Sequence, residues 1–244
     1  MGTSIRTAGL ETAAAALRYW ERKQEVLANN LANVNTDGFK GELAFAHLLG
    51  DGRTPVIDTA TDLAAGPMTT TGAPLDLAVE HDGFFVVQTA RGERLTRGGE
   101  LHLDANRQLV DRSGNPLLGE DDPNGGSTGP VVLPAHVASI RIDAGGAVVA
   151  DGHQVARLRL EHVDGDSTLR REPAGLFSPP ATRARIDIPR RTIRQGVREE
   201  SNVGTVTSLV DMIAVQRAYA SVQKVLTTID SARGIAVTEL GKPA

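Results

Sequence analysis

The sequence contains no cysteine among its 244 residues, which excludes disulfide bonds and cysteine-ligated metal ions. Aromatic residues make up only 3% of the chain, with one Trp, two Tyr and five Phe. Ligand pockets usually have apolar and aromatic walls, so this composition disfavours a large small-molecule site. Long apolar runs are also missing. No stretch approaches the roughly 18 apolar residues of a membrane-spanning helix, and we expect no such helix.

A strong charge excess is absent as well. The chain has 26 basic and 30 acidic residues and a net charge of −4, which argues against a dedicated nucleic-acid-binding protein. The one basic cluster places six arginines against a single aspartate in residues 183–198. A solvent-exposed strand face is the usual reason for such charge. The alternative is a contact with an acidic neighbour, which would make this segment a binding module.

The beginning of the chain carries no sign of a secretory signal. Residues 1–10 have neither a long apolar run nor a cleavage pattern of small residues. We therefore expect no cleaved signal peptide of the general secretory type.

Residues 7–34 are predicted to form a helix, because they contain no proline and include four consecutive alanines. Core-compatible residues recur at alternating spacings of three and four. This heptad seam is typical of helices that pack on another helix with a left-handed twist. The seam consists of Leu10, Ala13, Leu17, Trp20, Gln24, Leu27, Leu31 and Val34. The turn-forming run of residues 35–38 is predicted to end the helix.

Residues 203–237 are predicted to form a second long helix. Ser201 and Asn202 offer side-chain oxygens that suit the cap of its N-terminus. The same alternation of three and four recurs here in Met212, Val215, Tyr219, Val222, Leu226 and Ile229. The stripe is expected to be widened in its first turns by Val206, Leu209 and Ile213. A lone helix of this length is marginal in water, so we expect the two helices to pack on each other, on neighbouring subunits, or on both.

The middle of the chain changes to period two and short apolar runs, with turn signals roughly every 8–12 residues, which is typical of an all-β body. The predicted fold class is therefore α+β and mainly β, with a central all-β body between long terminal helices that pair as a coiled-coil-like unit. The expected divisions are an N-terminal helix (1–36), a linker or extended segment (37–74), a β-rich body (75–195), and a C-terminal helix with a tail (196–244).

Catalytic and metal-binding patterns are missing. The six histidines are scattered and none has a second histidine four positions away, so they are expected on surface loops. The acidic run at 120–124 contains Pro123 and has no distal glutamate, which favours a solvated turn over a cation site. Neither a phosphate-binding glycine loop nor a Gly-x-Ser-x-Gly turn occurs. We predict no catalytic, cofactor-binding or metal residue and no enzyme activity. The alternative is a soluble β-rich enzyme that acts on carbohydrate through paired carboxylates.

Asparagines are concentrated near the end of the first helix, with four in residues 29–35. Asparagine amides compete with the helical backbone, so this cluster is compatible with a fraying helix end. It is equally compatible with an amide network to a partner helix, because each amide carries two donors and an acceptor.

These asparagines belong to a run that resembles the N-terminal signature of flagellar rod and hook proteins. The run is Ala-Asn-Asn-Leu-Ala-Asn-Val-Asn-Thr-Asp-Gly-Phe-Lys at residues 28–40. Residues 195–196 and 200–203 resemble the segment that leads into the C-terminal helix of the same family. Residues 75–79, 82–87 and 96–97 look like its β body. The sequence departs from the family pattern at Leu95, Gly98, Gly99, Arg198 and Ala220.

The resemblance implies a structural subunit of the bacterial flagellar basal-body rod. Such a subunit polymerises axially through its terminal helices to form a periplasmic drive shaft, which transmits torque and encloses the export channel. It is exported through the flagellar type III apparatus without signal cleavage. Its implied partners are copies of itself, other rod proteins and that apparatus, with no cofactor, nucleic acid or small-molecule substrate. The short middle segment favours a proximal rod subunit, with a distal rod or hook subunit as the alternative.

The expected assembly residues combine the two helix seams with the terminal motifs. They are Leu10, Leu17, Trp20, Leu27, Asn30, Leu31, Asn33, Val34, Phe39, Ser201, Asn202, Val203, Met212, Ile213, Arg217, Tyr219, Val222, Leu226 and Ile229.

Overall fold

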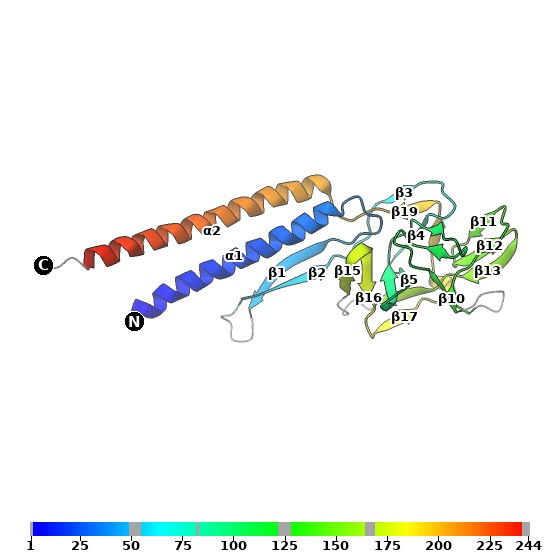
Figure 1. Cartoon of the computed structure of the whole chain (residues 1–244), viewed down its shortest axis with the longest axis horizontal. Coiled ribbons are helices and arrows are strands. Elements are labelled where there is room, and N and C mark those ends of the chain that lie inside the picture. Colours follow the sequence, from blue (N-terminus) through cyan, green and yellow to red (C-terminus); the bar gives the residue numbers. More distant parts are fainter. Residues whose placement is uncertain (1, 49–54, 82, 122–127, 164–168, 241–244) are drawn as a thin grey trace. The chain divides into compact units, whose positions relative to one another are not determined.

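The computed structural model of the chain describes residues 2–48, 55–81, 83–121, 128–163 and 169–240. It is mainly β, with two long helices, α1 (Gly2–Ala32) and α2 (Thr205–Leu240), as Figure 1 shows. The prediction of a mainly β fold with N- and C-terminal helices is confirmed. Neither helix, over its described residues, is long and apolar enough to cross a membrane.

The chain divides into two compact units. The first, called the helix unit, contains Met1–Ala32, Glu42–Ala60 and Gly204–Ala244. The second, called the β unit, contains Asn33–Gly41 and Thr61–Val203. The chain therefore returns to the helix unit between its two helices.

Within the helix unit, α1 contacts both α2 and the strand β1 (Glu42–Leu48). Strand β1 pairs with β2 (Pro55–Thr61) in a two-stranded sheet. Both strands lie within residues 37–74, where a linker or extended segment is predicted from the sequence. Alanine and histidine dilute the apolar alternation of β1, which makes the period-two pattern weak.

The β unit is built on a six-stranded sheet in which all pairs are antiparallel. Its order is β15 (Arg170–Glu172), β16 (Leu176–Ser178), β6 (Gly92–Thr96), β5 (Gly83–Thr89), β14 (Leu160–Val163) and β17 (Arg183–Arg185). A three-stranded sheet contains β11 (Ile140–Ile142), β12 (Ala147–Ala150) and β13 (His153–Arg157).

Short strand pairs complete the β unit. They are β3 (Met68–Thr70) with β19 (Val197–Glu199), β4 (Leu77–Val79) with β18 (Ile193–Gln195), β7 (His102–Leu103) with β8 (Leu109–Val110), and β9 (Leu118–Gly119) with β10 (Gly129–Pro130). Two 3-10 turns, η1 (Pro173–Gly175) and η2 (Ile188–Arg190), lie between strands.

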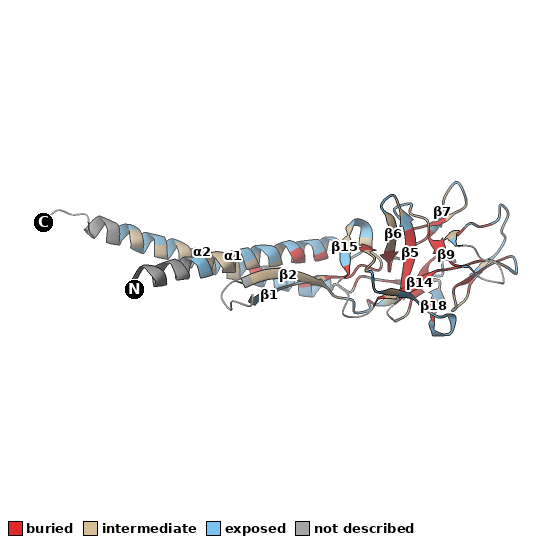
Figure 2. Ribbon diagram, turned by 90° about the horizontal axis from the view of Figure 1, so that it is seen from below, coloured by how far each residue is buried: buried red, intermediate tan, exposed pale blue. Residues whose placement is uncertain are grey.

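The core lies on both faces of β5, which Figure 2 shows as buried. Phe85 and Val87 belong to the larger buried cluster, whereas Phe84 and Val86 belong to a second cluster. Side chains alternate between the two faces of a strand, so this continuous apolar run is explained by a sheet that is covered on both sides. Phe84 packs edge-on against Phe177, with ring centroids 5.7 Å apart.

Candidate assembly surfaces and the connector junction

One stripe of α2 is less exposed than the rest of the helix. Val215 and Ser208 are buried, and the stripe continues through half-buried residues. These are the predicted Met212, Tyr219, Val222, Leu226 and Ile229. The Tyr219 hydroxyl donates a hydrogen bond to Glu21 of α1 at 3.0 Å, and this bond raises the pKa of Tyr219. The stripe therefore includes a direct contact between the two helices.

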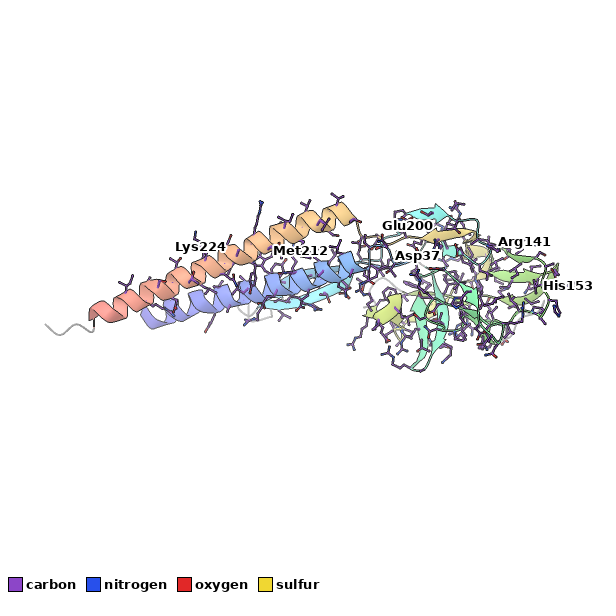
Figure 3. All side chains as sticks on the ribbon, turned by 45° about the horizontal axis from the view of Figure 1, so that its top comes forward. Asp37, Arg141, His153, Glu200, Met212 and Lys224 are labelled. Carbon is purple, nitrogen blue, oxygen red and sulfur yellow. The ribbon has the colours of Figure 1, made fainter. Side chains whose placement is uncertain are left out.

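A second apolar face of α2 is exposed. We call it the outer face and define it as Val206, Leu209, Val210 and Ile213, which are 75, 47, 60 and 51% exposed. The spacing of Val206, Val210 and Ile213 places these residues on one side of a helix. The expectation that Val206, Leu209 and Ile213 widen the other stripe is therefore wrong. Arg217 is also exposed, as is Lys224 on the same helix (Figure 3).

The predicted seam of α1 is half-buried at Leu17, Trp20, Leu27 and Leu31. The side chain of Leu10 lies outside the described part. The most buried described side chains of α1 are instead Val26 and Asn30. Since α1 contacts both α2 and β1, its buried surface is broader than a two-helix seam.

Asn30 joins α1 to the first residue of β1. Its Nδ2 donates to the Glu42 carbonyl at 2.8 Å, and its Oδ1 accepts from the Glu42 amide at 2.9 Å. The amide thus satisfies both backbone groups of Glu42, as a neighbouring strand would. Of the two interpretations of the asparagine cluster, neither describes Asn30, because its partner is a strand of the same chain.

The motif residues that flank the two helices meet inside the β unit. We call this region the connector junction and define it as residues 37–41, 62–67 and 198–203. The Gly38 amide donates to the Glu199 carbonyl at 2.6 Å, and the Asn202 amide donates to the Phe39 carbonyl at 3.2 Å. The Glu200 amide donates to the Pro67 carbonyl at 2.8 Å. The connectors after α1 and before α2 are thus direct neighbours.

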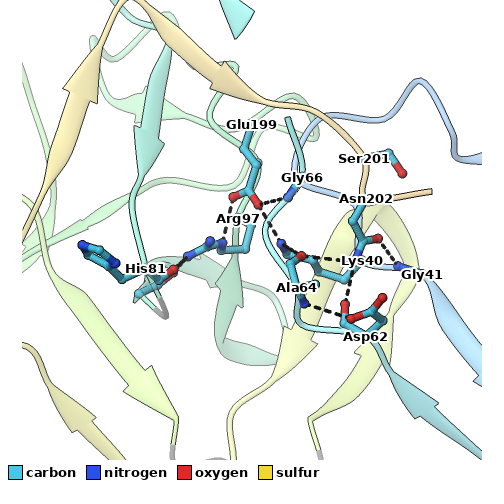
Figure 4. Close-up of polar contacts among 12 residues, drawn as sticks. Lys40, Gly41, Asp62, Ala64, Gly66, His81, Arg97, Glu199, Ser201 and Asn202 are labelled. Carbon is cyan, nitrogen blue, oxygen red and sulfur yellow. Dashed lines mark hydrogen bonds and ion pairs between the residues drawn. The ribbon is translucent and has the colours of Figure 1, made fainter. Parts of the chain in front are cut away.

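Three buried charges lie at the centre of the junction (Figure 4). The Glu199 carboxylate accepts from Lys40 Nζ at 2.6 Å and from Arg97 Nε at 2.9 Å. The side chains of Lys40 and Glu199 are each 1% exposed, and that of Arg97 is 3% exposed. Removing one partner of a buried ion pair typically costs about 3–5 kcal/mol, because the remaining charge stays buried.

Hydrogen bonds to backbone groups replace the hydrogen bonds to water that these buried charges lose. Lys40 Nζ also donates to the Ala64 carbonyl at 2.6 Å, and the Gly66 amide donates to Glu199 Oε1 at 2.9 Å. Arg97 Nη1 donates to the carbonyls of His81 and Gly83. Burial nevertheless lowers the pKa of Lys40, against the raising effect of Glu199. Two cations share one carboxylate, so the cluster has a net charge of +1.

Asn202 holds the strands of the junction together. Its Oδ1 accepts from the Gly41 amide at 2.8 Å, and its Nδ2 donates to the carbonyls of Asp62 and Ala64 at 2.9 and 3.2 Å. The predicted capping role of Asn202 is therefore wrong.

Ser201 does not cap the helix either. Its Oγ accepts from the Val203 amide at 3.2 Å. Helix α2 begins two residues after Val203, at Thr205, and the Ser208 amide donates to the Gly204 carbonyl.

Close backbone packing in the junction requires glycine at two positions. Gly38 has a φ of +66°, and a Cβ there would lie 2.4 Å from the carbonyl carbon of Arg97. A Cβ on Gly66 would lie 2.0 Å from the carbonyl oxygen of Glu200. Neither contact is sterically possible for another residue without displacement of the backbone.

Phe39 is 2% exposed and packs within its own chain. The Arg171 guanidinium lies 4.3 Å from the centre of its ring, and Arg171 Nη1 donates to the Lys40 carbonyl at 3.0 Å. Asn33 accepts from Thr36 in the turn after α1, and Val34 is half-buried.

Four of the six arginines in the basic cluster contact carboxylates of the same chain. The exposed Arg194 lies 3.6 Å from Glu80. Arg191 forms two bonds to Glu120, at 2.7 and 3.0 Å. Arg183 contacts Glu93 at 2.7 Å and Glu161 at 3.2 Å. Arg198 contacts Asp37 at 2.7 Å and Asp76 at 3.2 Å.

For Arg183, Arg191 and Arg198, which are buried or half-buried, the expected solvated strand face is wrong. The Glu120 end of the acidic run is buried as well, whereas residues 122–124 of that run lie outside the described residues. Burial raises the pKa of Asp37, against the lowering effect of Arg198.

Sequence reasoning did not identify Lys40, Arg97 or Glu199 as site residues. Lys40 and Arg97 do end two of the family-like runs, and Glu199 precedes a third. For Lys40 and Arg97, a charged residue directly before a glycine was the available signal, whereas Glu199 lies between Arg198 and Glu200 and has no such signal. Five of the six histidines, His153 of Figure 3 among them, are exposed. Over the described ranges, no three His, Asp or Glu residues gather in a way that could hold a metal ion.

Three family models match successive parts of the chain. The one described as flagella basal body rod protein matches residues 10–40, and the flagellar hook protein FlgE/F/G D1 domain matches residues 78–150. The flagellar basal body rod FlgEFG protein C-terminal model matches residues 194–238. The N-terminal and C-terminal matches together contain both helices' seams.

Curated relatives cover nearly the whole chain. It is 35% identical to the flagellar basal-body rod protein FlgF of Caulobacter vibrioides, over 91% of this chain and 93% of the relative. It is 34% identical to FlgF of Escherichia coli, over 91% and 94%. The flagellar basal-body rod protein FlgG of Bacillus subtilis is 29% identical, over 88% and 92%.

Proposed function

Because the chain belongs to the flagellar basal-body rod protein family, we propose that it is an axial rod subunit that polymerises through its two terminal helices. Membership makes it a structural protein of the flagellar basal body, not an enzyme, and one that assembles with other rod proteins. The alternative of a carbohydrate-active enzyme is thereby set aside.

The observation that carries the proposal is the distribution of exposed apolar side chains. Eleven large apolar side chains are exposed among the described residues, and only Leu63, Val132 and Ile188 of them belong to the β unit. The other eight belong to the helix unit, and they are Leu43, Phe45, Val206, Leu209, Val210, Ile213, Val225 and Ile235. Gathered apolar exposure of this kind marks interaction sites.

These exposed apolar side chains form two surfaces on different elements of the helix unit, which supports a head-to-tail assembly. One is the outer face of α2, and the other is formed by Leu43 and Phe45 on β1. A contact between two different surfaces does not close on itself and generates a helical filament. Each copy would offer one surface to the subunit ahead and the other to the subunit behind.

The resemblance to rod proteins also leads us to propose how the helices pair, what the assembled rod does and how the subunit reaches it. The two helices pair as a coiled-coil-like unit, and the half-buried stripe from Met212 to Ile229 supports this. The assembled rod is a periplasmic drive shaft that transmits torque and surrounds the export channel. The subunit reaches it through the flagellar type III export apparatus without a cleaved signal peptide.

A proximal rod subunit is the member of the family that we propose. The support is the single short β body between the helices, whereas longer hook subunits carry additional outer domains. A distal rod or hook subunit is the alternative within the family.

A charge on the outer face of α2 tests the proposal. Val210→Asp should abolish rod assembly and swimming, because the carboxylate would be buried against the next subunit. Val210 is 60% exposed in the single chain, so the purified variant should melt at the wild-type temperature. Gln216→Asp, at another exposed position of α2, is the matched control and should swim normally. Normal swimming of the Val210→Asp strain would contradict the proposal.

A further inference from the structure

The connector junction depends on its last segment for almost all of its hydrogen bonds. Residues 199–202 supply the partners of the Gly38, Gly41 and Gly66 amides. They also bond to the backbone of residues 39, 62, 64 and 67. Without them, two bonds join the two remaining segments directly. One runs from the Asp62 amide to the Gly41 carbonyl, and the other from Lys40 Nζ to the Ala64 carbonyl.

The charges of the junction have the same dependence. Lys40 and Arg97 both bind the Glu199 carboxylate, and no other carboxylate of the described residues forms an ion pair with either of them. The positive charge of Arg97 adds to the lowering of the Lys40 pKa, as expected for two cations held close together in a buried site. If Glu199 were absent, the closed junction would bury two like charges with no ion-paired carboxylate. The charge of Asp62, which also raises the pKa of Lys40, would be left as a partner without a direct contact.

We propose that the Glu199 carboxylate is the counter-ion that allows the connector junction to close. The junction stays open until residues 199–202 dock, because Lys40 and Arg97 cannot be buried together without this carboxylate. We call this dependence the lock. Lys40 and Glu199 are 159 positions apart, so this closure waits for nearly the whole chain. The hydrogen-bonded amides of residues 38–41 and 62–67 then become protected together.

The biological use of this lock rests on the proposed function. A subunit that is exported as an extended chain has to remain open until its C-terminal segment arrives. The buried cation pair would prevent the N-terminal part from closing early. A chain that ends before Glu199 would therefore keep the connector after α1 open, even where the rest of the β unit has folded.

Hydrogen exchange on the purified full chain tests the charge logic. In Glu199→Gln, amides of residues 38–41 and 62–67 should exchange at least about tenfold faster, as expected for local opening. The core amides of Leu109, Leu117 and Val131, which bond to one another's carbonyls, should keep their protection. Glu200→Gln changes the exposed neighbour and serves as the control, with wild-type exchange at Gly38 and Gly41.

A double variant distinguishes charge repulsion between Lys40 and Arg97 from a loss of packing around residue 199. Lys40→Met combined with Glu199→Gln removes one cation together with the anion, so it should exchange more slowly at the junction than Glu199→Gln alone. If loss of packing were the cause, the double variant would exchange faster at the junction than Glu199→Gln alone. If Glu199→Gln does not fold, recovery of folded protein in the double variant supports the lock. Unchanged protection in Glu199→Gln, or a double variant as open as the single one, would overturn it. Neither result depends on rod assembly, which the Val210→Asp experiment addresses separately.

Discussion

At the scale of single residues, the β unit contains carboxylates whose charge is held by arginines. Glu93 accepts from Arg159 at 2.8 and 3.1 Å and from Arg183 at 2.7 Å. Glu161 lies beside both arginines and is 2% exposed. This cluster joins β6, β14 and β17 across the six-stranded sheet, so its electrostatics contribute directly to the stability of that sheet.

The stability that Glu93 contributes should depend on pH. The hydrogen bonds from Arg159, together with Arg183, hold the pKa of Glu93 below its usual 4.5. The folded pKa lies below the unfolded one, so the contribution is complete above pH 4.5 and is lost as the pH falls through the folded pKa. Glu93→Gln should therefore lower stability at pH 7 by about 1 kcal/mol, discounted for the partial exposure of the side chain.

Thermal unfolding of Glu93→Gln and wild type at several pH values measures this difference. We expect the two melting temperatures to converge as the pH falls below the folded pKa. A gap that stays constant from pH 7 to the acid limit would show that the carboxylate charge is not the cause.

At the scale of elements, both helices could be predicted to within a few residues at most of their ends. The seam spacing and the alanine run indicated α1, although it begins at Gly2 and not at residue 7. Helix α2 begins at Thr205 because Asn202 bonds to Gly41, Asp62 and Ala64 and is unavailable as a cap. The strand β1 could not be predicted, because alanine and histidine weaken its period-two pattern. It is also joined to α1 through the side chain of Asn30. Contacts of this type depend on the fold and leave no periodic pattern.

Asn30 is expected to fix β1 to α1. Asn30→Ala removes the two hydrogen bonds between this side chain and the backbone of Glu42, each worth about 0.5–1.5 kcal/mol. Hydrogen exchange across residues 42–47 should rise in this variant while the six-stranded sheet keeps its protection. Asn35→Ala, at an exposed position of the same asparagine-rich run, is the control. Equal protection of β1 in Asn30→Ala and wild type would refute this role.

At the scale of the whole molecule, the two units carry different kinds of surface. The β unit buries two apolar clusters and binds its charges internally. The helix unit contains most of the exposed large apolar side chains. The family motifs in the sequence pointed to the right segments at both ends of the chain. The ion cluster of Lys40, Arg97 and Glu199 could not be derived from them, because no local pattern shows which distant segments meet.

The central claim is that this chain is an axial subunit of the flagellar rod, and deletion of its gene tests it most directly. Electron microscopy of basal bodies and swimming assays would be carried out on the deletion strain and on the same strain with the gene restored. We predict incomplete rods and no swimming without the gene, and recovery of both when it is supplied. Complete flagella and normal swimming in the deletion strain would contradict the claim.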